Sequence, residues 1–191
     1  MATLRPFRDY DEKDVINLYA LNYDYSTITS WDTRVAHGRL VKLSTEGWKN
    51  DHEIDMIGHA GDMHITGTVH QRYGVKSKVD LAGAAEAVLG MTLNHVAKLD
   101  ENGEQLKFNP RKASELEAVI EGQPVPIVTR GLFLIEDAAL AALNSGAGPD
   151  AGSDLTSGAD GGLAVWTSGD PVIGKTLGQA AGDLILIKLE L

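Results

Sequence analysis

Short segments that alternate apolar and polar residues, separated by turns rich in glycine, dominate the chain after residue 36. The clearest alternation occupies residues 184–191 (LILIKLEL), where Ile185, Ile187, Leu189 and Leu191 share one face of an extended strand. Comparable strand patterns occur at residues 38–44, 64–70, 123–135, 163–166 and 172–177. We therefore expect a mainly β fold whose last strand runs to the end of the chain.

Helical patterns are few and short. Residues 136–143 (EDAALAAL) predict a short helix, and residues 110–118 fit either a helical turn or a loop. Residues 79–99 are typical of a helix in their alanine-rich first half and of a buried strand in their second half. Asn102 and Gly103 predict a hairpin turn, because this pair readily adopts the positive φ angles that such turns require.

Residues 144–162 consist mainly of Gly, Ala, Ser and Asp. Such side chains offer little apolar area to bury, and glycine favours turns and flexible connections. We expect a flexible, solvated loop here that contributes nothing to the core.

Residues 1–36 differ from the β-rich domain predicted for residues 37–191, because acidic residues precede an apolar run that shows no sustained alternation. We interpret this segment as an extended N-terminal arm, which either folds back onto the domain or docks on a partner. Apolar and aromatic side chains of this kind form the energetic centre of many interfaces. The candidate partner-binding residues are Phe7, Tyr10, Val15, Ile16, Leu18, Tyr19 and Leu21.

The composition indicates that the chain folds, and its charge disfavours some classes of partner. Its 191 residues suit one domain, and 43% hydrophobic with 23% charged residues is ordinary for globular proteins. A net charge of −10 disfavours nucleic acid as a partner. Acidity increases toward the C-terminus, since residues 133–191 carry 2 basic and 8 acidic side chains. The absence of cysteine excludes disulfides and thiol nucleophiles, and without a membrane-span pattern or an apolar signal region we expect no membrane association.

One segment has the composition of a metal site. Residues 51–70 contain His52, Asp55, His59, Asp62, His64 and His70, and imidazole and carboxylate are ligands for zinc or iron. No pair at a three- or four-residue interval has a helical pattern behind it, and on a strand His64 and His70 would lie roughly 20 Å from each other. Surface or interface histidines explain the segment better. A metal-dependent or sugar-binding β-sandwich remains the alternative that this segment leaves open.

Other motifs of catalysis are weak. No Gly-x-Ser-x-Gly string is present. The carboxylate pair at residues 100–101 lies in a predicted turn, where we expect solvation to keep the pKa of both acids ordinary. Residues 174–176 (GKT) resemble the end of a phosphate-binding loop, but glycines and a strand follow where that loop requires a helix. We predict no enzymatic activity, no cofactor and no catalytic or metal-binding residues.

Five parts of the chain carry a resemblance to known proteins. They are residues 4–18 (LRPFRDYDEKDVINL), 100–106 (DENGEQL), 110–113 (PRKA), 122–131 (GQPVPIVTRG) and the closing 172–177 (VIGKTL) with 182–189 (GDLILIKL). Together they resemble the capsid decoration (cement) proteins of tailed phages.

This resemblance implies a single β-barrel or β-tulip-like domain with an extended terminal arm and one or two short helices. It also implies a structural protein that binds the outer surface of an assembled phage head and bridges neighbouring copies of the major capsid protein. Self-association as a trimer, or as a dimer, would be expected, and the protein would be found on the virion after assembly in the host cytoplasm. Another virion accessory protein, of the tail or baseplate, is the alternative within the same setting.

Overall fold

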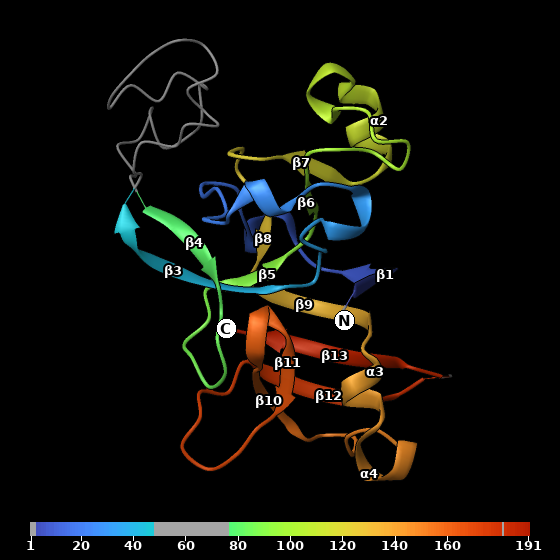
Figure 1. Cartoon of the computed structure of the whole chain (residues 1–191). Helices are drawn as coiled ribbons and strands as arrows, with labels where there is room; N and C mark the ends of the chain where they lie inside the picture. Colours follow the sequence, from blue (N-terminus) through green and yellow to red (C-terminus); the bar gives the residue numbers. More distant parts are fainter. Residues whose placement is uncertain (1–2, 48–76, 181) are drawn as a thin grey trace.

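The structure is a computed structural model of the chain that describes residues 3–47, 77–180 and 182–191 (Figure 1). Its largest element is a six-stranded antiparallel sheet of order β1-β9-β13-β12-β10-β11. In that order the strands are β1 (Thr3–Asp9), β9 (Arg130–Glu136), β13 (Leu184–Glu190), β12 (Gly174–Gln179), β10 (Asp154–Ser157) and β11 (Leu163–Val165). The first and last described parts of the chain thus lie in one sheet, on either side of β9.

A second antiparallel sheet has five strands, in the order β2-β8-β5-β3-β4. They are β2 (Val15–Ile16), β8 (Ile127–Val128), β5 (Gly90–Thr92), β3 (Leu40–Gly47) and β4 (Ser77–Leu81). A separate parallel pair joins β6 (His95–Ala97) to β7 (Ala118–Ile120). The mainly β class is confirmed. The sheets among the described residues are open, so they do not form the closed barrel implied by the resemblance.

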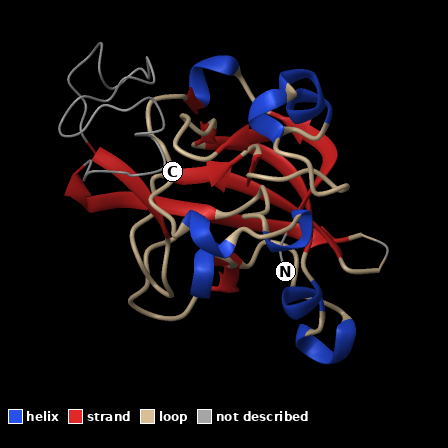
Figure 2. Cartoon of the chain, turned by 45° about the horizontal axis from the view of Figure 1, so that its top comes forward, coloured by secondary structure: helices blue, strands red, loops and turns tan. Residues whose placement is uncertain are grey.

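Helices are short and lie around the strands (Figure 2). The α-helices of the described residues are α2 (Pro110–Glu115), α3 (Ala138–Ala141) and α4 (Leu143–Gly146). Five 3-10 turns accompany them in the same residues: η1 (Glu12–Asp14), η2 (Tyr25–Thr27), η3 (Trp31–Thr33), η4 (Leu106–Phe108) and η5 (Ala159–Gly161). In Figure 1, α3 and α4 lie beside the six-stranded sheet, whereas α2 lies beside β7 at the other end of the molecule. Capping by Asn109 and Asp137 fixes where α2 and α3 begin.

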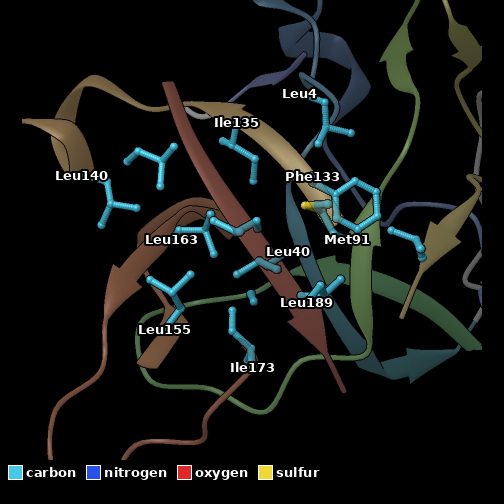
Figure 3. Close-up of a cluster of buried hydrophobic side chains, with 14 of the residues drawn as sticks. Leu4, Leu40, Met91, Phe133, Ile135, Leu140, Leu155, Leu163, Ile173 and Leu189 are labelled. Atoms are coloured by element: carbon cyan, nitrogen blue, oxygen red, sulfur yellow. The ribbon is translucent and has the colours of Figure 1, made fainter. Parts of the chain in front are cut away.

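The main hydrophobic core lies between the two large sheets, because both sheets contribute its side chains (Figure 3). Leu4, Phe133 and Leu189 come from the six-stranded sheet. Leu40 and Met91 come from the five-stranded sheet and are completely buried. Each such side chain stabilises the fold by roughly 1.5–3 kcal/mol, so this cluster fixes how the sheets pack.

The prediction for the C-terminal strand is confirmed. Ile185, Ile187 and Leu189 are at most 1% exposed, and the intervening residues of β13 are half-buried or exposed. The strand pairs with β9 on one side and with β12 on the other, so it lies in the interior of its sheet. Leu191, expected on the same face, is instead exposed.

The apolar run at residues 123–135 is extended, as predicted, but it belongs to both large sheets. It divides at Thr129, whose backbone N–H and hydroxyl both donate to the carbonyl of Asp14 (2.9 and 3.1 Å). β8 precedes this point in the five-stranded sheet, and β9 follows it in the six-stranded sheet. One continuous apolar segment therefore connects the two halves of the core.

The tight turn at Asn102 and Gly103 is present. Gly103 has a φ of +83°, and the carboxylate of Asp100 accepts hydrogen bonds from the backbone N–H groups of Asn102 and Glu104 (both 2.8 Å). A single antiparallel bridge, between Leu99 and Gln105, closes it. Of the predicted helices, residues 136–143 contain α3, residues 110–118 contain α2, and the alanine-rich half of 79–99 contains turns and no helix.

The prediction of a flexible loop at residues 144–162 is wrong. Asp154 to Ser157 form β10, which pairs with both β11 and β12, and Leu155 is 1% exposed in the main core. Glycine favoured the loop interpretation, yet here Gly148 and Gly161 have positive φ angles that turn the chain tightly between packed segments. Composition alone does not reveal a short buried strand placed between glycine turns.

The structure also differs from the predicted arm of residues 1–36. Described residues from Thr3 onward are part of the body, because β1 pairs with β9 and β2 pairs with β8. Leu21 is completely buried and forms a bridge with Val79. The segment folds back, which was one of the two alternatives, and it does not project as an arm. The strand predicted at residues 64–70 lies outside the described residues.

Candidate interaction surface

The predicted partner-binding residues divide into an exposed and a buried group. Phe7 is 52% and Tyr10 39% exposed. Val15, Ile16, Leu18 and Tyr19 are half-buried, and all but Leu18 pack against the hydrophobic clusters. Leu21 is in the core. Phe7 and Tyr10 are therefore the members that a partner reaches first, whereas the others mainly hold the N-terminal segment on the body.

Strand β1 positions the exposed pair. It is an edge strand whose pairing with β9 is interrupted between Leu4 and Arg8, the stretch that contains Pro6. Proline cannot donate to a ladder and is tolerated at such irregular edge positions. The ring of Tyr10, which follows the strand, stacks on Phe133 with centroids 5.9 Å apart. The strand edge thus presents two aromatic side chains, one of which is fixed by the core.

An ion pair between Arg8 and Glu117 lies beside these aromatics. The Arg8 Nη2 and Glu117 Oε2 atoms are 2.7 Å apart, and the arginine side chain is only 16% exposed. Glu117 has a φ of +48°, a conformation that is strained for a residue other than glycine and persists where the surrounding structure holds it. The pair joins residues 109 positions apart in the sequence.

Two pockets share this ion pair as a common wall. The larger, of about 540 Å³, is lined by Arg8, Tyr10, Glu12, Val15, Asn17, Leu93, Asn94, Ser114, Glu117 and Pro126. The smaller, of about 330 Å³, is lined by Leu4, Arg5, Pro6, Arg8, His37 and Glu117. We call these two pockets together with Phe7 the β1 surface. Aromatic side chains and arginine, which are both present here, are enriched in the centres of protein interfaces.

A buried, stacked pair of histidines lies next to β1 and holds the strand in place. The rings of His37 and His95 lie 3.8 Å apart and nearly parallel, and both residues are buried. The Leu4 N–H donates to His37 Nδ1 (3.1 Å), and the His37 N–H donates to His95 Nδ1 (3.0 Å). Each ring therefore accepts at Nδ1 and must be neutral there. This chain of hydrogen bonds links β1 to β6.

Burial keeps both imidazoles uncharged. Desolvation, with the nearby His37, Arg34 and Arg8, lowers the pKa of His95 to about 3. Desolvation also lowers the pKa of His37, against the opposing effect of its own backbone hydrogen bond. Trp31 packs edge-on against His95 with ring centroids 5.4 Å apart. At neutral pH the two neutral rings therefore hold β1 in place through hydrogen bonds and are not poised to act as a general acid or base.

Sequence reasoning did not find Arg8, Glu117, His37 or His95. Each is a single polar residue without a motif, and contacts across 58 or more positions bring them together. A local signal existed only for the histidines, which stand beside the apolar segments that became β3 and β6. Periodicity did not show that the two histidine rings stack on each other.

The suspected metal ligands cannot be located in the described part of the structure, and that part contains no alternative metal site. His52, Asp55, His59, Asp62, His64 and His70 lie outside the described residues. Within residues 3–47, 77–180 and 182–191, no group of three or more His, Cys, Asp or Glu side chains is arranged to hold a metal ion. None of the helices in these same ranges has the length and apolar character needed to span a bilayer.

Comparisons with protein-family models, with curated proteins and with solved structures found no match to this chain.

Proposed function

We propose that this protein is a non-catalytic structural protein that binds the outer surface of an assembled phage capsid. The observation that carries the proposal is the β1 surface, where Phe7 and Tyr10 are exposed on an edge strand beside the Arg8–Glu117 ion pair. A few residues, most often tryptophan, tyrosine and arginine, supply most of the binding energy in typical protein interfaces. The capsid as the partner rests on the resemblance of the sequence to cement proteins.

In this proposal the β1 surface contacts the major capsid protein and bridges neighbouring subunits, which stabilises the head. The protein self-associates, as a trimer or as a dimer, so that several β1 surfaces engage the lattice at once. Multivalent attachment of this kind makes weak single contacts effective, because later contacts form at high local concentration. No cofactor takes part, and the negative charge of the chain keeps it away from the packaged DNA.

Rebinding to undecorated heads tests the proposal. Phe7→Ala should weaken attachment roughly tenfold to a hundredfold, since truncating a central aromatic removes a hot spot. The control is Phe108→Ala, because Phe108 is 78% exposed on η4 and does not belong to the β1 surface. Binding is measured by co-sedimentation, and head stability by the temperature at which the heads release DNA.

Three outcomes would contradict parts of the proposal. If the intact protein binds no heads, the capsid function is wrong, and co-purification with tails would favour the alternative of a tail or baseplate protein. If Phe108→Ala weakens binding as much as Phe7→Ala, the interface lies elsewhere. If the heads bind the protein but gain no thermal stability, the protein attaches without bridging subunits.

A further inference from the structure

A third pocket, on another part of the molecule, is lined by two arginines. It has a volume of about 490 Å³ and is bounded by the segment around η3, the start of β3 and η5. Its lining residues are Tyr23, Asp32, Thr33, Arg34, Val35, Arg39, Leu81, Ala159 and Asp160. It shares no residue with the β1 surface.

Arg39 is unusual because it is only 8% exposed and yet forms no ion pair with an acidic side chain of the described residues. Its Nη1 donates to the backbone carbonyl of Asp160 (2.7 Å), which is the one hydrogen bond that its guanidinium makes within the described residues. Desolvation lowers the pKa of Arg39, and the charges of Asp160 and Asp137 offset this effect only in part. By contrast, Arg5 and Arg8 each pair with a glutamate.

Arg34 shows the same deficit. Its Nη1 donates to the Trp31 carbonyl (2.7 Å), and its guanidinium stacks over the Trp31 ring at 4.2 Å. Its Nε is buried and has no hydrogen-bond partner among the residues that the structure describes. A buried donor without an acceptor is costly, so the fold places this guanidinium beside the pocket at an energetic expense. Among the described residues, no carboxylate oxygen lies within 4.0 Å of a guanidinium nitrogen of Arg34 or Arg39.

The turn that holds Arg39 is itself constrained. Asp160 has a φ of +52°, and a side chain on Gly161 would overlap the backbone of Leu40. The Gly161 N–H also donates to the Ala82 carbonyl (2.7 Å), which fixes η5 against the strands. Backbone strain in a non-glycine residue is retained where the surrounding structure enforces it, frequently at binding sites. Here the strained residue is the one whose carbonyl orients the arginine.

We propose that this pocket binds a carboxylate group, held by the guanidinium groups of Arg34 and Arg39. A planar carboxylate matches the fork of a guanidinium, and the exposed Tyr23 offers a hydroxyl donor in the same lining. Asp32 and Asp160 also line the pocket, so a singly charged ligand is favoured over a doubly charged phosphate, which these acids would repel more strongly. The carboxylate comes either from a small metabolite or from an acidic side chain of a partner.

The test uses the full chain, isotope-labelled, with arginine side-chain resonances followed by NMR at constant ionic strength. The probes are sodium acetate, a glutamate blocked at both main-chain ends, and inorganic phosphate. Acetate and the blocked glutamate should bind saturably with millimolar dissociation constants. A blocked glutamate that binds more than about tenfold tighter than acetate assigns the site to a protein side chain, and equal binding assigns it to free carboxylates.

Three variants and a control make the result specific. Arg39→Gln and Arg34→Gln should each weaken carboxylate binding about tenfold or more, because each removes a charge-assisted donor. Asp160→Asn should strengthen binding about threefold, since it removes a negative charge, and asparagine tolerates the left-handed backbone of that position. The control is Arg130→Gln, which makes the same charge change at an exposed position of β9 outside the pocket.

The variant at Asp160 keeps the test decisive if Arg39→Gln does not fold. A loss of affinity in Arg130→Gln equal to that in Arg34→Gln would mean unspecific attraction and overturn the proposal. Saturable binding of phosphate alone, or no saturable binding of any probe, would overturn it as well. None of these outcomes depends on capsid attachment, so the two proposals fail separately.

Discussion

Gly174 lies where β12 contacts β13, and the packing there leaves no room for a side chain. A Cβ at this position would overlap the backbone carbonyl oxygen of Lys188, the residue diagonal to it on the neighbouring strand. Backbone atoms of a paired strand cannot move aside without breaking the ladder. The glycine that resembled part of a phosphate-binding loop thus has a structural reason to be there.

The substitution Gly174→Ala should therefore lower the free energy of unfolding by about 2–3 kcal/mol, the usual cost of forcing atoms into a packed site. Urea unfolding followed by circular dichroism measures it. Gly83→Ala is the matched control, because its Cβ would meet only the flexible carboxylate of Glu86 at 3.0 Å. Equal losses in both variants would show that the approach of the two strands is not the cause.

At the scale of elements, β1 depends on the neutral state of the histidine pair that supports it. The pKa of His95 is lowered to about 3, and that of His37 is lowered too, relative to 6.5 in the unfolded chain. Depressed values favour folding above pH 6.5, and this contribution is lost as the pH falls, because the unfolded chain takes up protons first. Arg8 and Arg34 reinforce the effect at both rings, and Glu117 opposes it at His37.

His95→Asn tests this dependence. The free energy of unfolding of the intact protein should fall as the pH decreases below about 6.5, with a slope that approaches about 1.4 kcal/mol per pH unit from His95 and a further contribution of the same sign from His37. Asparagine retains an acceptor for the His37 N–H but does not titrate. The free energy of unfolding of the variant should therefore depend less steeply on pH, by at least the contribution of His95. Urea unfolding at several pH values measures both proteins. Identical slopes would mean that the histidine pair does not couple stability to pH.

Periodicity predicted some elements well and failed for others, for identifiable physical reasons. The alternation at residues 184–191 was readable because a half-buried strand repeats every two residues. Residues 123–135 were read as one strand, since a turn at Thr129 between two sheets changes no local pattern. Residues 154–157 were missed because four residues between glycine turns are too few to show a period. In both of these segments, pairing with strands distant in the sequence determines the structure.

At the scale of the whole molecule, the candidate sites depend on contacts that no local pattern encodes. Two exposed members of the predicted interface, Phe7 and Tyr10, were found because aromatics in a polar segment stand out in a sequence. The Arg8–Glu117 pair and the arginine pocket were not, because a lone arginine carries no motif and its burial is a property of the fold. The sequence suggested the kind of surface and the structure supplied its composition.

The order of the six-stranded sheet makes the N-terminal segment a part of the body. Deleting residues 1–10 removes β1, the buried Leu4 and the stacking of Tyr10 on Phe133, and it leaves His37 without its backbone donor. We expect the free energy of unfolding to fall by at least about 3 kcal/mol, comparable to the loss of one large core side chain. A detachable arm would instead leave the stability unchanged.

Phe7→Ala is the control for that deletion, because it retains the strand and truncates only an exposed side chain. Urea unfolding gives the stability, and hydrogen exchange of β9 reports whether the edge left by β1 opens locally. The two variants also separate attachment from folding in the capsid assay. If Phe7→Ala is stable but fails to bind heads, the β1 surface makes the contact. If the deletion is as stable as the intact chain and still binds, the N-terminal segment has neither role, and the interface must lie on another part of the sheets.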